Sequence, residues 1–283
     1  MIERRMFLGT AAAFVATGCA GAEQHPTTLD SSTLNSLTLA GPLEQGSLVV
    51  GKAGAAAAVT VDGNTVSVSP DGRFAFGLAY DQTRATHIVA GATTRDVVPV
   101  VRKYDIQTVN GLPQKTVTPP KEVQARIARE NALVAEARKR DTAMTAFAET
   151  FDWPIKGIVS GTFGNQRIDN GTPMAPHFGV DIAAPQGTPI RAPVDGTVTL
   201  AEPDFYLTGG TTMLDHGHGV STVYLHQSAL KVKVGDRVRR GDVIGLVGMK
   251  GRATGPHLHW GMNWFAMRLD PSRSAATTAP EKG

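Results

Sequence analysis

Cysteine is almost absent from this chain, and long runs of one charge or of apolar residues are missing too. Cys19 is the only cysteine among 283 residues, so neither an intramolecular disulfide nor a thiolate metal site can form. The formal net charge is only +3, and Lys and Arg form no dense run, which argues against a nucleic-acid partner. Gly (31 residues) and Pro (17 residues) are instead plentiful and spread out, which predicts many tight turns between short strands.

The N-terminus has the pattern of an export signal. The apolar run at 7–15 is shorter than the roughly 20 residues that a membrane span needs. Residues 16–19 then resemble a lipobox, with Ala in place of the usual Leu, which predicts lipidation of Cys19 and a lipid anchor in a membrane. Residues 3–8 also resemble a twin-arginine signal, and an ordinary secretory signal cleaved after Ala20 is the alternative. Each of these three signals predicts export, which places the mature protein outside the cytoplasm, in the cell envelope. A lipid anchor would hold it in the periplasm, at a membrane.

Two β-rich regions separated by a helix are predicted beyond this signal. Residues 58–61 and 65–68 alternate apolar and polar side chains around Asp62-Gly63, a hairpin signature in what we expect to be an immunoglobulin-like β-sandwich. Residues 121–150 lack Gly and Pro and favour a helix with a thin apolar stripe. The predicted organisation is an export signal at 1–19, a tether at 20–39, the β-sandwich at 40–110, a helical connector at 119–150, a second β domain at 151–271 and a polar tail at 272–283.

Six of the eight histidines lie in the second β domain. His177 and Asp181 are separated by four residues and His257 and His259 by two, and in an extended chain even separations point to one face. Imidazole and carboxylate are the ligands that zinc takes when no thiolate is present. Each spacing alone is weak evidence. The pair His216/His218, flanked by glycines, is better explained as a β-turn than as a chelating pair.

The residues around these histidines make the pattern specific. From about Ser160 to Gly261 the chain resembles the lysostaphin-type (LytM-domain) zinc metallopeptidases, which are peptidoglycan endopeptidases. The segments that carry the resemblance are His177–Ile182, Gly187–Ile190, Ala192–Val198, Asp215–Gly217, Tyr224–His226, Val234–Gly245 and Thr254–Trp260.

The resemblance implies a fold, a metal and a set of roles. The expected fold is mainly β, with an open antiparallel sheet that carries a groove over the metal. His177, Asp181 and His259 match the ligands of one zinc ion, and His226 and His257 match the two histidines beside the reacting water. Zinc lowers the pKa of bound water and polarises a carbonyl, while a histidine relays a proton and its partner stabilises the oxyanion. The sequence does not assign these last two roles.

Two other functions fit parts of the chain. A non-catalytic protein of the same fold, which binds and activates other wall hydrolases, would lack some of the five site residues, and here all five are present. Residues 234–243 also resemble the hairpin of biotinyl and lipoyl carrier domains, but Lys250 follows the hairpin instead of preceding it. The sequence therefore predicts a zinc endopeptidase acting on peptidoglycan peptide stems.

Overall fold

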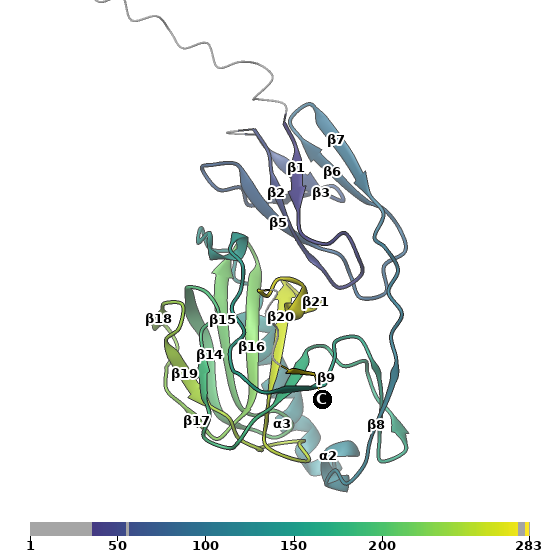
Figure 1. The fold of residues 1–283 in the computed structure, drawn as a ribbon, viewed down its shortest axis with the longest axis vertical. Helices are drawn as coiled ribbons and strands as arrows, with labels where there is room; N and C mark the ends of the chain where they lie inside the picture. Colours follow the sequence, from purple (N-terminus) through teal and green to yellow (C-terminus); the bar gives the residue numbers. More distant parts are fainter. Residues whose placement is uncertain (1–35, 55–56, 277–280, 283) are drawn as a thin grey trace, which may run out of the picture.

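The computed structural model describes residues 36–54, 57–276 and 281–282, so the predicted lipidation site at Cys19 lies outside the described residues. The described chain is mainly β, with several antiparallel sheets and one long helix, α3 (Lys121–Ala137), which confirms the predicted fold class. Figure 1 shows the N-terminal strands at the top and the largest sheet below them, joined by an extended segment. Within the described residues, no helix is long and apolar enough to cross a membrane.

Two small sheets form the N-terminal part and share one apolar core. Their strands are β1 (Thr38–Ala40), β2 (Leu48–Lys52) and β5 (Arg73–Gly77) in the first sheet, and β3 (Val59–Val61), β4 (Asn64–Val66), β6 (Thr86–Ala90) and β7 (Thr93–Val97) in the second. The predicted hairpin is present as β3 and β4. Its two turn residues, Asp62 and Gly63, have φ values of 50° and 80°, as a two-residue hairpin turn with the twist of its strands requires.

The connection between the two halves contributes to the second half. Strand β8 (Ile106–Val109) pairs in parallel with β10 (Gln166–Asp169), and β10 pairs with β11 (Thr172–Pro173). After the short helix α2 (Gln114–Val117), α3 packs its C-terminal end on the largest sheet. Ala137 is buried there in a cluster with Leu200, Phe205, Met213 and Val223. The helix ends at Ala137, so the prediction of helix as far as residue 150 is wrong for residues 138–150, and α3 also covers apolar surface of the sheet.

The largest sheet is open and antiparallel except at one edge. Its strand order is β18 (Arg237–Val238), β14 (Gly196–Phe205), β15 (Gly209–Gly217), β16 (Val220–Gln227), β20 (His257–Trp264), β12 (Val180–Ala183), β9 (Ile158–Gly161) and β22 (Glu281–Lys282), with β21 (Met267–Leu269) paired to β20. A smaller sheet of β13 (Pro189–Arg191), β19 (Val243–Leu246) and β17 (Ala229–Leu230) lies beside it. Two short 3₁₀ turns, at Ala146–Ala148 and Pro271–Arg273, complete the described elements.

Alternation along β20 fixes which side chains face the groove. Leu258 and Trp260 are fully buried in the core, whereas His257 and His259, which alternate with them along the strand, are only partly buried. Successive side chains of a strand point to opposite faces, so burial of the apolar set forces both imidazoles to the other face. Burying a side chain the size of Leu258 contributes about 1.5–3 kcal/mol, which holds the strand in this register.

Candidate metal centre

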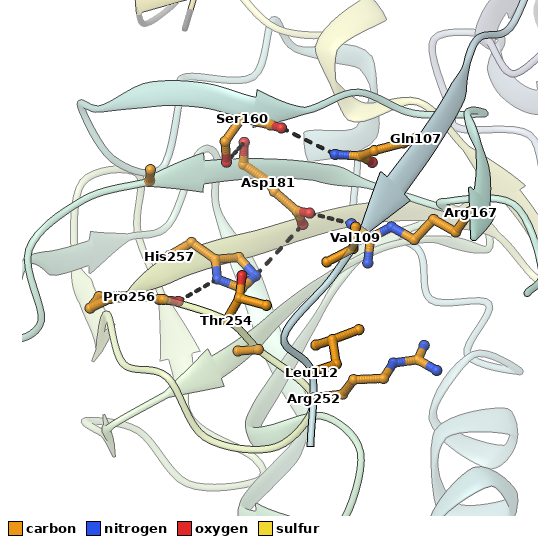
Figure 2. Close-up of a pocket in the computed structure, with 13 residues that line it drawn as sticks. Gln107, Val109, Leu112, Ser160, Arg167, Asp181, Arg252, Thr254, Pro256 and His257 are labelled. Atoms are coloured by element: carbon orange, nitrogen blue, oxygen red, sulfur yellow. Dashed lines mark hydrogen bonds and ion pairs between the residues drawn. The ribbon is translucent and has the colours of Figure 1, made fainter. Parts of the chain in front are cut away.

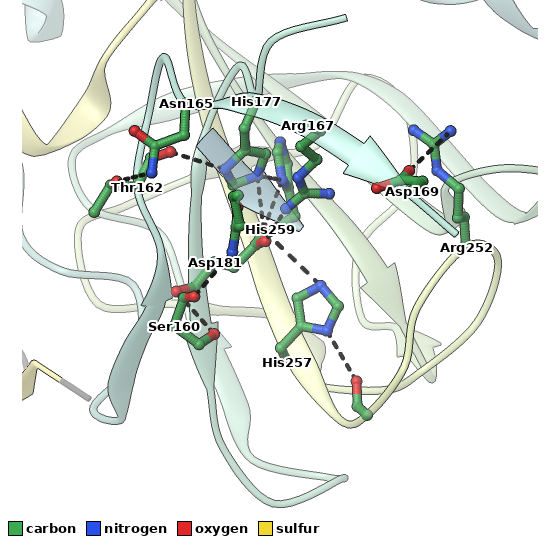
Figure 3. A network of polar contacts seen from close by, with 12 residues as sticks. Ser160, Thr162, Asn165, Arg167, Asp169, His177, Asp181, Arg252, His257 and His259 are labelled. Carbon is green, nitrogen blue, oxygen red and sulfur yellow. Dashed lines mark hydrogen bonds and ion pairs between the residues drawn. The ribbon is translucent and has the colours of Figure 1, made fainter. Parts of the chain in front are cut away.

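Three side chains converge on the groove-facing side of β12 and β20. Asp181 and His259 are register partners on these adjacent antiparallel strands. His177 precedes β12 in a loop, which two backbone hydrogen bonds, from His177 N to Asn165 O and from Gly164 N to His177 O, hold in place. His177 Nε2 lies 3.0 Å from Asp181 Oδ1 and 2.9 Å from His259 Nδ1, which is itself 2.9 Å from Asp181 Oδ1 (Figure 3).

These three atoms suit a metal ion better than a network of hydrogen bonds. His177 Nδ1 donates to Thr162 O at 3.0 Å, so in the neutral ring Nε2 is an acceptor. Asp181 Oδ1 is also an acceptor. Only His259 Nδ1 can then carry a proton, and one proton cannot form hydrogen bonds across all three of these short contacts. Ligands at about 2.0 Å from a tetrahedral zinc ion are about 3.3 Å apart, close to the separations found here. The three residues thus form a candidate metal-binding group.

The charge of Asp181 is also set by its surroundings. Burial by itself would raise the pKa of this carboxyl, but the adjacent His177 and His259 rings hold the pKa well below its ordinary value. Its second oxygen, Oδ2, contacts the guanidinium of Arg167 from β10. Asp181 is therefore a carboxylate with one oxygen fixed by an arginine and the other facing the two histidines.

Two more imidazoles lie next to this group. His226 is near the end of β16 with a left-handed φ of 63°, and its Nδ1 donates to Lys250 O at 2.7 Å. His257 Nδ1 donates in the same way to Gly255 O at 2.9 Å, and its Nε2 is 3.9 Å from Asp181 Oδ1. The His226 and His257 ring centroids are 4.7 Å apart.

The backbone carbonyls therefore fix the state of both rings. A carbonyl only accepts, so in each neutral ring Nδ1 carries the proton and Nε2 keeps its lone pair. Burial, together with the neighbouring His257 and His259, lowers the pKa of His226 to about 3. His226 is then a neutral base across the physiological pH range. All five predicted site residues thus gather at one place.

The groove has walls that the motifs did not reveal. One hollow, of about 280 Å³, runs from Asp181 and His257 to Arg252 and is closed on one side by Gln107, Val109 and Leu112 of the connection (Figure 2). Gln107 Nε2 donates to Ser160 O at 3.3 Å. The segment 106–112 carries no motif, and only its parallel pairing with β10, distant in sequence, brings it here.

The other two histidines of this domain are not a chelating pair, and the turn prediction is correct for His218 but wrong for His216, which lies in β15. His216 is buried away from the metal group and bonds Asp195 O and Thr222 Oγ1 through its two ring nitrogens. His218 lies in the turn after β15 with φ 51° and stacks on Phe147. Lys250 is exposed in a loop.

Geometry of this kind is that of a metal-binding site, and comparison with known proteins shows which proteins carry a similar sequence. Residues 175–271 match Peptidase family M23. DD-carboxypeptidase/endopeptidase Mpg of Neisseria meningitidis serogroup B is 45% identical over 106 residues, or 37% of this chain and 24% of that protein. Peptidoglycan DD-endopeptidase ShyA of Vibrio cholerae is 43% identical over 121 residues, or 42% of this chain and 28% of that protein.

A solved structure extends the likeness beyond the catalytic region. The crystal structure of a candidate M23 peptidase from Pseudomonas aeruginosa is 28% identical with a TM-score of 0.63, and the match covers 85% of this chain and 96% of that one. The matches to the curated relatives span only about a quarter of their lengths. The match to Peptidase family M23 is confined to residues 175–271, within the C-terminal part of the chain.

Proposed function

We propose that this chain is a zinc-dependent endopeptidase that hydrolyses peptide crosslinks of bacterial peptidoglycan. The carrying observation is the convergence of His177 Nε2, Asp181 Oδ1 and His259 Nδ1 within 3.0 Å of one another at the base of a groove. The similarity to ShyA, which is named as a peptidoglycan DD-endopeptidase, supports the substrate class.

In this proposal His177, Asp181 and His259 hold one zinc ion, which when bound lowers the pKa of water and polarises a carbonyl. His226 and His257 keep unprotonated Nε2 atoms because their Nδ1 atoms donate to backbone carbonyls, and their ring centroids are 4.7 Å apart beside the metal group. One of them takes a proton from the attacking water, and the other stabilises the negative charge that develops on the scissile carbonyl oxygen. Arg167 orients Asp181 by holding its second oxygen.

The location we propose follows from the N-terminal pattern. An exported protein with a lipid on Cys19 would be held at a membrane of the cell envelope, within reach of the peptidoglycan. Cys19→Ser should then release the protein from the membrane fraction without loss of its wall-cleaving activity. Unchanged membrane fractionation of this variant would contradict the anchor.

The test of the activity is digestion of purified crosslinked peptidoglycan, with identification of the released products by mass spectrometry. Zinc-loaded protein should convert crosslinked stem peptides to uncrosslinked ones, and a chelator should stop the conversion. A protein that binds wall and zinc but leaves every crosslink intact would fit the regulator instead. Polyglycine-bridged walls, digested in parallel, report the bond that is preferred.

A further inference from the structure

Among the described residues, one arginine beside the metal group has no carboxylate partner. Arg268, on β21, is the register partner of Asn263 on β20, and Asn263 lies four residues beyond His259. Residues an even number of positions apart on one strand lie on the same face of the sheet, and so do residues that are register partners on adjacent strands. Arg268 is therefore on the same face of the sheet as His257 and His259.

A second hollow, of about 270 Å³, connects this arginine to the metal group. It is lined by His177, His226 and His259 together with Arg167, Arg252 and Arg268, and no Asp or Glu is among its described lining residues. Arg167 is tied to Asp181, and Arg252 Nη1 lies 3.6 Å from the buried carboxylate of Asp169. The charge of two of the three guanidiniums is thus balanced within the protein.

Arg268 is different from these two. Among the residues that the structure describes it has no ion pair, and it donates to Asn263 Oδ1 at 3.3 Å while its guanidinium carbon lies 6.0 Å from the centroid of the Phe178 ring. Burial lowers its pKa to about 10. Its neighbour Arg138, at the end of α3, also has no carboxylate partner in the described chain, and its buried Nε has no hydrogen-bond acceptor.

Leaving a guanidinium half-buried without an anion is unfavourable. Arg102, whose side chain is 14% exposed, has Asp270 at 2.9 Å. A guanidinium has five donors in a planar fork that matches a carboxylate. The free donors of Arg268 therefore favour an anionic group of a ligand in the hollow.

We propose that Arg268 binds a free carboxylate on the substrate peptide next to the scissile bond, which selects crosslinks whose amine-side residue carries such a carboxylate. This inference rests on the proposed endopeptidase function, because the peptide must lie across the metal group to bring that carboxylate into the second hollow. A polyglycine bridge is uncharged at this position and lacks the group that Arg268 would bind. Arg268 is thus a specificity-determining residue.

Two synthetic crosslinked peptides that differ in one group test this directly. One carries a free carboxylate on the amine-side residue and the other a carboxamide. Zinc-loaded wild-type protein should cleave the acid with a kcat/KM about 10- to 100-fold above that of the amide, as expected for a charge-assisted hydrogen bond. Arg268→Met should abolish the preference for the acid over the amide, while Arg268→Lys recovers part of it.

The controls separate this inference from the function on which it rests. Arg95→Met, on the exposed face of β7, removes the same charge and should keep the preference. Equal cleavage of both peptides by the wild type, or an equal loss on both in a zinc-replete Arg268→Met protein, overturns the role of Arg268 alone. If neither peptide is cleaved, the proposed function fails. Calorimetric binding of the two peptides to zinc-loaded protein then tests whether Arg268 binds the carboxylate. Equal affinity for the acid and the amide overturns this role of Arg268.

Discussion

Gly179, two residues after His177, is the position where one methyl group should disable the metal centre. A Cβ there would lie 2.4 Å from His259 Nε2 and 2.7 Å from Trp260 O. Trp260 is fully buried and its strand is paired on both sides, so its carbonyl cannot retreat. The His259 ring must then move by about 1 Å to restore van der Waals distance, several times the roughly 0.2 Å tolerance of metal–ligand bonds.

The expected result of Gly179→Ala is a zinc affinity at least about 100-fold weaker, equivalent to about 2.7 kcal/mol of binding free energy. Overpacking should also lower the free energy of unfolding of the metal-free protein by about 1–3 kcal/mol. Competition with a chromogenic chelator measures the first quantity, and urea unfolding measures the second. Gly255→Ala is the matched control, because a Cβ at Gly255 meets no atom within 4 Å. Wild-type zinc affinity in a folded Gly179→Ala protein would refute this reasoning.

Two further predictions concern stability. Burial lowers the pKa of His216 to about 4 and of His226 to about 3, so between these values and the ordinary 6.5 the unfolded chain binds protons that the folded chain does not. The free energy of unfolding of chelator-treated protein should therefore fall as the pH is lowered from 6.5 towards 4, by up to about 1.4 kcal/mol per pH unit for each histidine, and equal urea midpoints at pH 7 and pH 5 would contradict this. Removal of residues 1–149 takes α3 off the cluster that contains Met213 and Val223 and should cost several kcal/mol, so a truncated protein that melts at the full-length temperature would show that this packing contributes little.

Local signals in the sequence were sufficient for much of the fold. Asp62-Gly63 predicted the hairpin because these residues accept the positive φ values of its turn. The His-x-His spacing placed His257 and His259 on one face because the period of a strand is two. The same strand-period argument does not apply to His177, because His177 lies in a loop before β12 and contacts Asp181 from there.

Other parts of the site depend on contacts between residues far apart in the chain. Gln107 lines the groove only because β8 pairs with β10, about sixty residues further on. Arg268 joins the face of His259 only through the pairing of β21 with β20. Neither residue belongs to a motif, and no periodicity in the sequence indicates these pairings. The sequence also gave no sign that α3, whose apolar stripe is thin, covers part of the sheet.

The central claim is that His259 binds the metal and that His257, two residues away, acts on the reacting water. Zinc content and crosslink-cleavage rate, measured together for His259→Ala and His257→Ala, test it most directly. His259→Ala should lose zinc and activity together, because one of three ligands is removed. His257→Ala should keep stoichiometric zinc and lose about 10²–10⁴-fold in rate. Zinc lost from His257→Ala but retained by His259→Ala would reverse the assignment, and full activity in either variant would contradict the proposed site.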